Sequence, residues 1–296
     1  MTLCWRSARG DSTIITRREL LAASGAGALA AALNAVLPAA PLGAADLLTP
    51  YIKLAGSLDE RLIIWWLKGQ RYGTVAAQAT PLFGWEVGRF YQFFRQANGS
   101  FLLAMFQLGY YTDTNTGRRL ERFPNPITGV VNDVTHLVRR PAIYQYTAAG
   151  RFIPALNDSV VRYRSQVSPV SVNGDTVQIA SSINAEMLSP FPGTPNRCIN
   201  DHITVTGLRS DLLDPGTPSA PAALSYRNVE PWEPWMKMGN QSGQMTSWAT
   251  GRKLESLAEM PTGYLEMARA VHPWLIRDPI ETLAVQVQKI RNLLAG

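Results

Sequence analysis

The sequence predicts a mainly β fold in which antiparallel strands form a meander that closes, or nearly closes, into a barrel, with helices at the C-terminus. Runs rich in aromatic and β-branched residues recur between positions 61 and 206, and short turn sequences separate them. Asn-Gly pairs at 98–99 and 173–174 are strong hairpin signals. So many strands in one domain either stack as two sheets or close into a barrel, and we favour the barrel.

The composition is that of a globular protein. Of the 296 residues, 46% are hydrophobic and 17% are charged, which supplies a core and argues against disorder. The formal net charge is +6, and the basic residues are scattered along the chain. This balance is too mild to predict a nucleic-acid partner.

Residues 1–45 resemble a twin-arginine export signal. Arg17-Arg18 precedes a weakly hydrophobic, Ala- and Gly-rich run from Leu20 to about Leu37, and small residues suited to a signal peptidase follow. That run is too weakly apolar for a stable transmembrane anchor, and no other run is long enough to cross a bilayer. We therefore expect the twin-arginine translocase as a partner during export, a periplasmic or extracellular destination, and no stable membrane span after cleavage.

The first strands are expected between residues 61 and 112. Arg61–Lys68 and Arg71–Ala76 predict two strands around a turn at Gly69-Gln70, although a short apolar run can also be a buried helix. Trp85–Ala97 and Ser100–Thr112 predict a hairpin around Asn98-Gly99. The polar, turn-rich stretch 112–128 that follows is expected to be a surface loop, a common place for functional residues.

Further strands are expected up to residue 206. Residues 130–146 predict a strand that is interrupted at Arg139-Arg140-Pro141. Residues 167–172 and 175–187 predict a hairpin around Asn173-Gly174, and residues 197–206 predict another strand. The pairs of strands together predict the antiparallel meander.

The C-terminus is expected to be helical. A short helix is predicted over residues 262–271. Asp278 can cap a second helix whose first residue is Pro279, and apolar residues then recur at helical spacing. We expect a barrel-like domain over residues 46–278 and an amphipathic helix over residues 279–296 packed on it.

Candidate catalytic residues are His136, Asp133 and Tyr110. If residues 130–138 form one strand, Asn132 and His136 share a face with valines, and an imidazole on an apolar inner face could serve as a general base. The alternative is a hydrogen-bonded core histidine. The three histidines of the chain lack the spacing of metal ligands, so no metal site is predicted.

Candidate ligand-binding residues are Asn132, Glu186, Trp232 and Trp235. A buried carboxylate such as Glu186 could bind a polar group, although a lone charge on a strand more often faces solvent. The tryptophans could line a pocket for an aromatic ligand, although large rings are more often part of the core. The sequence does not indicate a cofactor.

The order of several motifs is similar to that of a bacterial family. These motifs are Tyr-Tyr-Thr-Asp-x-x-Thr-Gly (110–117), Phe-Pro-Asn-Pro-Ile-Thr-Gly (123–129), Val-x-Asn-Asp-Val (130–134) and Trp-x-Pro-Trp-Met-Lys-Met-Gly (232–239). Over roughly residues 62–273 the chain resembles the family called domain of unknown function 1838, whose members often carry a twin-arginine signal. The resemblance implies that Asp113, Asn125, Asn132, Asp133, Trp232 and Trp235 are signature positions of the family, and it implies no activity.

Three classes of function are compatible with these observations. The first is an exported enzyme that acts on a small apolar or phenolic molecule in a barrel pocket. The second is a non-catalytic protein of the cell envelope that binds such a molecule. The third is an envelope protein that interacts through aromatic surface residues. No serine-hydrolase or nucleotide-binding motif occurs, so whether the chain is an enzyme stays open at this point.

Overall fold

A computed structural model describes residues 48–147, 152–154, 160–188 and 197–295. The expected signal segment, residues 1–45, lies outside these ranges. Among the described residues, no helix has the length and apolar character needed to cross a membrane.

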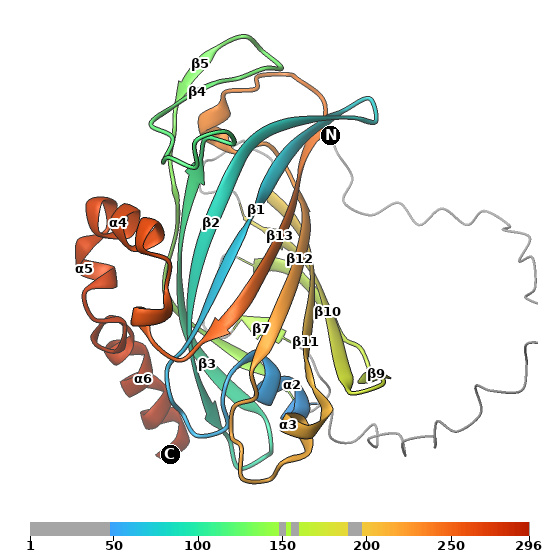
Figure 1. The fold of residues 1–296 in the computed structure, drawn as a ribbon, viewed down its shortest axis with the longest axis vertical. Coiled ribbons are helices and arrows are strands. Elements are labelled where there is room, and N and C mark those ends of the chain that lie inside the picture. The colour runs from blue at the N-terminus through green and yellow to red at the C-terminus, as the bar shows by residue number, and fades with distance from the viewer. Residues whose placement is uncertain (1–47, 148–151, 155–159, 189–196, 296) are drawn as a thin grey trace, which may run out of the picture. The chain divides into compact units, whose positions relative to one another are not determined.

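The described chain is mainly β, as predicted. Eleven strands form one antiparallel sheet in the order β7-β6-β3-β2-β1-β13-β12-β11-β10-β8, with β9 also paired to β10, and β4 and β5 form a separate hairpin. The sheet curls into a half-barrel (Figure 1), and its edge strands β7 and β8 approach each other without a hydrogen-bonded ladder among the described residues. The strands are β1 (Ile63–Val75), β2 (Gln78–Arg95), β3 (Phe101–Thr112), β4 (Arg122–Pro124), β5 (Val131–Asp133), β6 (Leu137–Tyr146), β7 (Phe152–Pro154), β8 (Val160–Val167), β9 (Ser171–Asn173), β10 (Thr176–Met187), β11 (Arg197–Leu208), β12 (Ala222–Glu230) and β13 (Gln244–Leu254).

Helices lie at one end and on the outside of the sheet. In Figure 1, α2 and α3 lie at the lower end of the half-barrel, and α4 to α6 lie along the outside of β2 and β3. The helices are α2 (Leu48–Ala55), α3 (Arg209–Leu213), the short 3-10 turns η2 (Pro234–Met236) and η3 (Leu257–Glu259), α4 (Thr262–Val271), α5 (Pro273–Ile276) and α6 (Pro279–Ala295). The two predicted C-terminal helices are therefore confirmed.

The predicted turn at Gly69-Gln70 is wrong, because β1 runs through it without a break. A side chain at Gly69 would place its Cβ 1.9 Å from the carbonyl oxygen of Trp248 on β13, so glycine is required by a close approach of two strands. The chain turns later, at Ala76 and Ala77, which both have positive φ angles of 47° and 65°. A turn made by two alanines carries no sequence signal, since Gly or Asn normally occupies such positions.

The hairpin at Asn98-Gly99 is confirmed, with a different turn geometry from the two-residue form. Only Gly99 has a positive φ, of 81°, and its N–H donates to the carbonyl of Gln96 at 3.0 Å. Gln96 then pairs with Ser100 across a three-residue loop. This is a type I turn followed by a glycine bulge. The second hairpin is also confirmed, with Gly174 at a φ of 58° between β9 and β10.

The interruption predicted at Arg139-Arg140-Pro141 is wrong in position. Strand β6 continues through these residues, and Pro141 lies at an irregularity in its pairing with β3, where its missing N–H breaks no ladder bond. The actual break covers residues 134–136 between β5 and β6. His136 therefore does not share a strand with Asn132, and the common face expected for the two residues does not exist.

Two hydrophobic cores lie on the two faces of the sheet, and β3 contributes to both. Phe101, Leu103 and Met105 belong to the inner core with α2, whereas Leu102 and Phe106 belong to the outer core with α4 to α6. Every residue of β3 is buried, which explains why its sequence is apolar without alternation. The outer helices thus cover one face and leave the concave face to form an interior.

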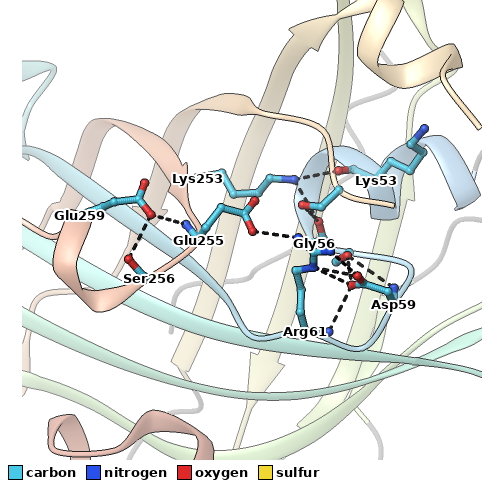
Figure 2. A network of polar contacts seen from close by, with 10 residues as sticks. Lys53, Gly56, Asp59, Arg61, Lys253, Glu255, Ser256 and Glu259 are labelled. Atoms are coloured by element: carbon cyan, nitrogen blue, oxygen red, sulfur yellow. Dashed lines mark hydrogen bonds and ion pairs between the residues drawn. The ribbon is translucent and has the colours of Figure 1, made fainter. Parts of the chain in front are cut away.

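Helix α2 closes the lower end of the half-barrel and is held there by a lysine. The Nζ atom of Lys253 on β13 donates to the backbone carbonyls of Lys53 and Gly56, at 2.8 and 3.0 Å (Figure 2). These carbonyls lie at the C-terminal end of α2, where intrahelical donors are missing. Nearby, Arg61 bridges Asp59 and Glu255, which ties the segment after α2 to the end of β13.

Helix α6 begins with the expected cap. The Oδ1 atom of Asp278 accepts hydrogen bonds from the N–H groups of Ile280 and Glu281 at 2.9 and 3.1 Å. Leu283 and Ile290 on its inner stripe are fully buried in the outer core. The amphipathic pattern therefore correctly located the face that packs on the sheet.

Candidate functional site

The concave face of the half-barrel encloses a cavity of about 360 Å³. Its walls come from opposite sides of the curled sheet, with β1, β2, β3 and β6 on one side and β10, β11 and β12 on the other, and Tyr51 and Ala55 of α2 also line it. Apolar and aromatic side chains such as Trp65, Leu103 and Met105 form much of the wall. Concave, mostly apolar spaces of this size with a few polar groups are typical ligand sites.

A network of ionic side chains lines the cavity. Arg71 on β1 forms ion pairs with Glu230 on β12 and with Glu233 just after it, and Arg197 on β11 pairs with the same two carboxylates at 2.6 and 3.3 Å. The hydroxyl of Tyr111 donates to Glu233 at 2.8 Å. The guanidinium of Arg71 also lies 5.1 Å from the centre of the Trp85 ring. Two arginines and two glutamates thus compensate one another inside the sheet.

The network sets the protonation states of its members. Burial alone would raise the pKa of Glu230, but the attraction of Arg71 and Arg197 outweighs burial and lowers that pKa to about 2. Burial raises the pKa of Tyr111 well above its usual value, in spite of Arg71. Glu230 is therefore a carboxylate and Tyr111 a neutral hydrogen-bond donor at neutral pH.

A second polar group lies on β11 and β12. The hydroxyl of Tyr226 donates to the Oδ1 atom of Asp201 at 2.9 Å, and the guanidinium of Arg89 lies 4.9 Å from the centre of the Tyr226 ring. Burial raises the pKa of Asp201, although Arg89, the Tyr226 hydrogen bond and Arg139 act in the opposite direction. Asp201 is consequently a carboxyl group with a raised pKa that faces the cavity.

The predicted catalytic residues His136 and Tyr110 lie together near the end of β3. The Nδ1 atom of His136 accepts a hydrogen bond from the backbone N–H of Tyr111 at 3.1 Å, and its ring lies 5.6 Å from that of Tyr110. The Tyr110 hydroxyl lies 3.0 Å from the Nδ1 atom of His272. Burial, together with the charge of Arg119, lowers the pKa of His136 to about 4, so its imidazole is neutral.

Asp133 and the predicted ligand-binding residues are placed apart. Asp133 is exposed on β5, and Asn132 is buried beside it with its amide donating to the carbonyl of Val130 at 3.4 Å. Glu186 lies on β10, half-buried. None of the seven predicted site residues is among the described residues that line the cavity. Their roles therefore stay predictions, separate from the cavity.

The two predicted tryptophans close the upper end of the half-barrel. Trp235 packs against the rings of Phe83, Tyr111 and Phe123, with centroid distances between 5.6 and 5.8 Å. Trp232 donates its indole N–H to the carbonyl of Gln241 at 3.2 Å. In Figure 1 the β4–β5 hairpin and the loop that contains η2 cover this end. These rings thus shape the interior without lining the cavity.

Sequence reasoning missed the polar lining of the cavity. Arg89 is a charge within the apolar sequence of β2. Its guanidinium lies over the ring of Tyr226, whose hydroxyl bonds Asp201, and both residues are on strands more than 100 positions away. The sequence places Arg71 after a turn at Gly69-Gln70, but β1 runs through these residues without a break. Several strands carry an ionisable residue at a position that faces the interior, and this was the available signal. Because the outer faces of β2 and β3 are also apolar, the alternation that would separate inward from outward positions is not visible in their sequences.

The fold and the cavity define an antiparallel half-barrel with an ionic interior site. The chain belongs to the family described as "Protein of unknown function (DUF1838)", whose model matches residues 59–287. Comparison with curated proteins gave no significant match, and comparison with solved structures gave none either. Within the described ranges, no three His, Cys, Asp or Glu side chains gather closely enough to hold a metal ion.

Proposed function

We propose that the protein binds a small apolar or aromatic molecule that carries a polar group, in the interior cavity of its half-barrel. The observation that supports this most is the cavity of about 360 Å³ with apolar walls and converging ionic side chains. An interior that served stability alone would be filled with apolar side chains, because buried ion pairs contribute little net stability compared with apolar replacements.

The ionic side chains are held in place before any ligand arrives. Arg71 and Arg197 each contact both Glu230 and Glu233, and the Tyr111 hydroxyl fixes Glu233 from another strand. Groups that are already ordered lose little conformational entropy when a ligand binds. The network therefore supports recognition by a preformed site.

The test is mass spectrometry of small molecules that co-purify with the full-length protein. Two matched variants on β11 control for the location of the site: Ile203→Trp fills the cavity from its wall, and His202→Trp places the same ring on an exposed position of the same strand. We expect a bound molecule with the unmodified protein and with His202→Trp, and its loss with Ile203→Trp. A bound molecule that Ile203→Trp retains, or no bound molecule in any sample, would contradict the proposal.

An enzyme that acts on such a molecule is the second candidate, and Asp201 favours it. Its raised pKa and its hydrogen bond from Tyr226 suit a group that transfers protons at the cavity wall. His136, Asp133 and Tyr110 remain the alternative catalytic set. Once the ligand is known, Asp201→Asn should retain binding and abolish its conversion, as followed by chromatography. Conversion that survives in Asp201→Asn would remove Asp201 from the catalytic role.

We also propose that the protein is exported by the twin-arginine translocase to the periplasm or the extracellular space. The support is the sequence of residues 1–45, with Arg17-Arg18 before a weakly hydrophobic run. Changing both residues to lysine keeps the charge and removes the guanidinium pair, so the precursor should accumulate in the cytoplasm. Cell fractionation that finds the variant outside the cytoplasm in normal amounts would refute this route.

A further inference from the structure

The proposed cavity site has an excess of positive charge. Four arginines line the cavity, against three acidic residues, Asp201, Glu230 and Glu233. The glutamates are already paired with Arg71 and Arg197. Arg89 and Arg139 remain, and among the described residues no carboxylate lies within ion-pair distance of either one. Asp201 is the acidic residue that faces them, and its pKa is raised by burial.

Among the buried groups of the cavity that lack a hydrogen-bond partner, donors outnumber acceptors. Four donors on lining residues have no partner within the described structure, namely the Nε atoms of Arg71, Arg89 and Arg197 and the Nε1 atom of Trp85. A single lining acceptor, the Oδ1 atom of Asn228, is unsatisfied in the same way. Arg89 is 6% exposed, so bulk water does not compensate it. Buried donors are normally satisfied, so the imbalance calls for a ligand rich in acceptors.

The register of the sheet aligns the two arginines that have no carboxylate within ion-pair distance among the described residues. Arg89 on β2 is the cross-strand partner of Gln107 on β3, and Gln107 is the partner of Arg139 on β6. Cross-strand partners in an antiparallel sheet project from the same face, so the three side chains form a row on the inner wall. Trp65 extends the row on β1, opposite Arg89. Asp201 and Tyr226 approach from the other side of the half-barrel.

Apolar wall adjoins this row. Met105 and Leu103 follow Gln107 at inward positions of β3, and Tyr51 of α2 closes the space below them. A ligand with an acidic group at the arginine row can therefore place an apolar body between the row and α2. Guanidinium groups bind carboxylates by paired, charge-assisted hydrogen bonds, which fixes orientation as well as charge.

We infer that the ligand of the cavity is a small organic carboxylate whose acid group is bound by Arg89 and Arg139 and whose apolar body lies against Trp65, Leu103 and Met105. This inference rests on the proposed function and specifies its ligand class. A carboxylate oxygen supplies the acceptor that the Nε atom of Arg89 lacks, and the negative charge balances the excess positive charge of the lining. The volume of about 360 Å³ suits a molecule of one or two rings, or a short alkyl chain.

The test compares two probes of the same shape, 2-naphthoate and 2-naphthamide, by isothermal titration calorimetry with the full-length protein. The carboxylate should bind at least about tenfold more tightly than the amide, which is the effect of one charge-assisted hydrogen bond. Arg139→Gln should abolish this preference, and Arg139→Lys should restore part of it. Arg139 is only half-buried, so its replacement leaves the core intact. Arg140→Gln is the matched control, because Arg140 is the next residue and is exposed outside the cavity.

The outcomes separate this inference from the proposed function. Equal affinities for acid and amide, or a preference that Arg139→Gln retains, would overturn the carboxylate assignment and leave cavity binding standing. Failure of both probes to bind would also overturn the assignment. In that case the mass spectra of co-purifying molecules show whether the cavity binds a ligand at all. A neutral molecule that is present with the unmodified protein and lost with Ile203→Trp would still support the proposed function.

Discussion

Arg71 and Glu230 form an ion pair between β1 and β12 in which only 4% and 7% of the side chains are exposed. The two residues lie on strands that are separated by β13, and the pairing depends on the curl of the sheet. The pair is also the centre of the ionic network on the cavity wall. Loss of the pair should therefore lower the stability of the protein and change the shape of the site.

Replacement of one partner should therefore be costly. Glu230→Gln leaves Arg71 with a single ion pair, the longer one to Glu233 at 3.5 Å. We expect a loss of about 3–5 kcal/mol in the free energy of unfolding, measured by urea denaturation. The control is Glu121→Gln, since Glu121 is 69% exposed in its pair with Arg119 and should cost less than about 1 kcal/mol. A loss in Glu230→Gln as small as that in Glu121→Gln would contradict the cost expected for leaving the buried charge of Arg71 uncompensated.

Lys253 should make the stability of the protein depend on alkaline pH. Burial lowers its pKa in the folded protein to about 7, from 10.5 as the ordinary value. Between these two values the unfolded chain binds more protons than the folded one, so the free energy of unfolding should rise as the pH is raised from 7 towards 10.5. Below pH 7 both states carry the proton, and this contribution is constant.

The variant Lys253→Met tests this dependence. It keeps the length of the side chain and removes the titration, so the rise in stability above pH 7 should become smaller than in the unmodified protein. Lys289→Met, at an exposed position of α6, is the control and should follow the original curve. A pH dependence that is identical in all three proteins would refute the assignment to Lys253.

Two glycines should respond in opposite directions to alanine. Gly69→Ala places a Cβ atom 1.9 Å from the carbonyl oxygen of Trp248, so it should destabilise the sheet by several kcal/mol, about as much as other severe overpacking. Gly263 lies in α4 with open space around it, and Gly263→Ala should stabilise the protein by about 0.5–1 kcal/mol. Thermal unfolding measures both. A folded and unperturbed Gly69→Ala protein would contradict the close approach of β1 and β13.

His136→Ala separates the two candidate sites. His136 lies off the cavity, and its Nδ1 atom accepts a hydrogen bond from the Tyr111 backbone. If the cavity is the site, the variant should bind the co-purifying ligand with unchanged affinity and lose about 1–2 kcal/mol of stability, because a buried donor is left unsatisfied. Loss of ligand binding in a variant with normal stability would instead favour the site predicted from the sequence around His136.

The class of the fold could be predicted because its signals are local. The hairpin at Gly99 requires one positive φ angle, and the cap of α6 requires one carboxylate at Asp278; both are visible in a few adjacent residues. The errors arose where a distant contact decides the local structure. Gly69 looked like a turn residue, but the backbone of Trp248, far away in the sequence, is what excludes a side chain there.

The site could not be predicted in the same way. A histidine is a natural catalytic candidate in a sequence because its ordinary pKa lies near neutral pH. In the folded protein, however, burial lowers the pKa of His136, and its neutral ring accepts a hydrogen bond from a backbone N–H. Arg89, Arg139 and Asp201 converge only because the sheet curls and brings β2 and β6 opposite β11. The register that aligns Arg89 with Arg139 depends on the irregularity at Pro141, a position where the sequence predicts an interruption of the strand.

The most direct test of ligand binding in the cavity is a crystal structure of the full-length protein with the molecule that co-purifies with it. We expect electron density inside the half-barrel, with an acceptor group within hydrogen-bond distance of Arg89 and Arg139 and an apolar body against Met105. Density beside Tyr110, His136 and His272 with an empty interior, or a cavity that contains only ordered water in the ligand-bound protein, would contradict it.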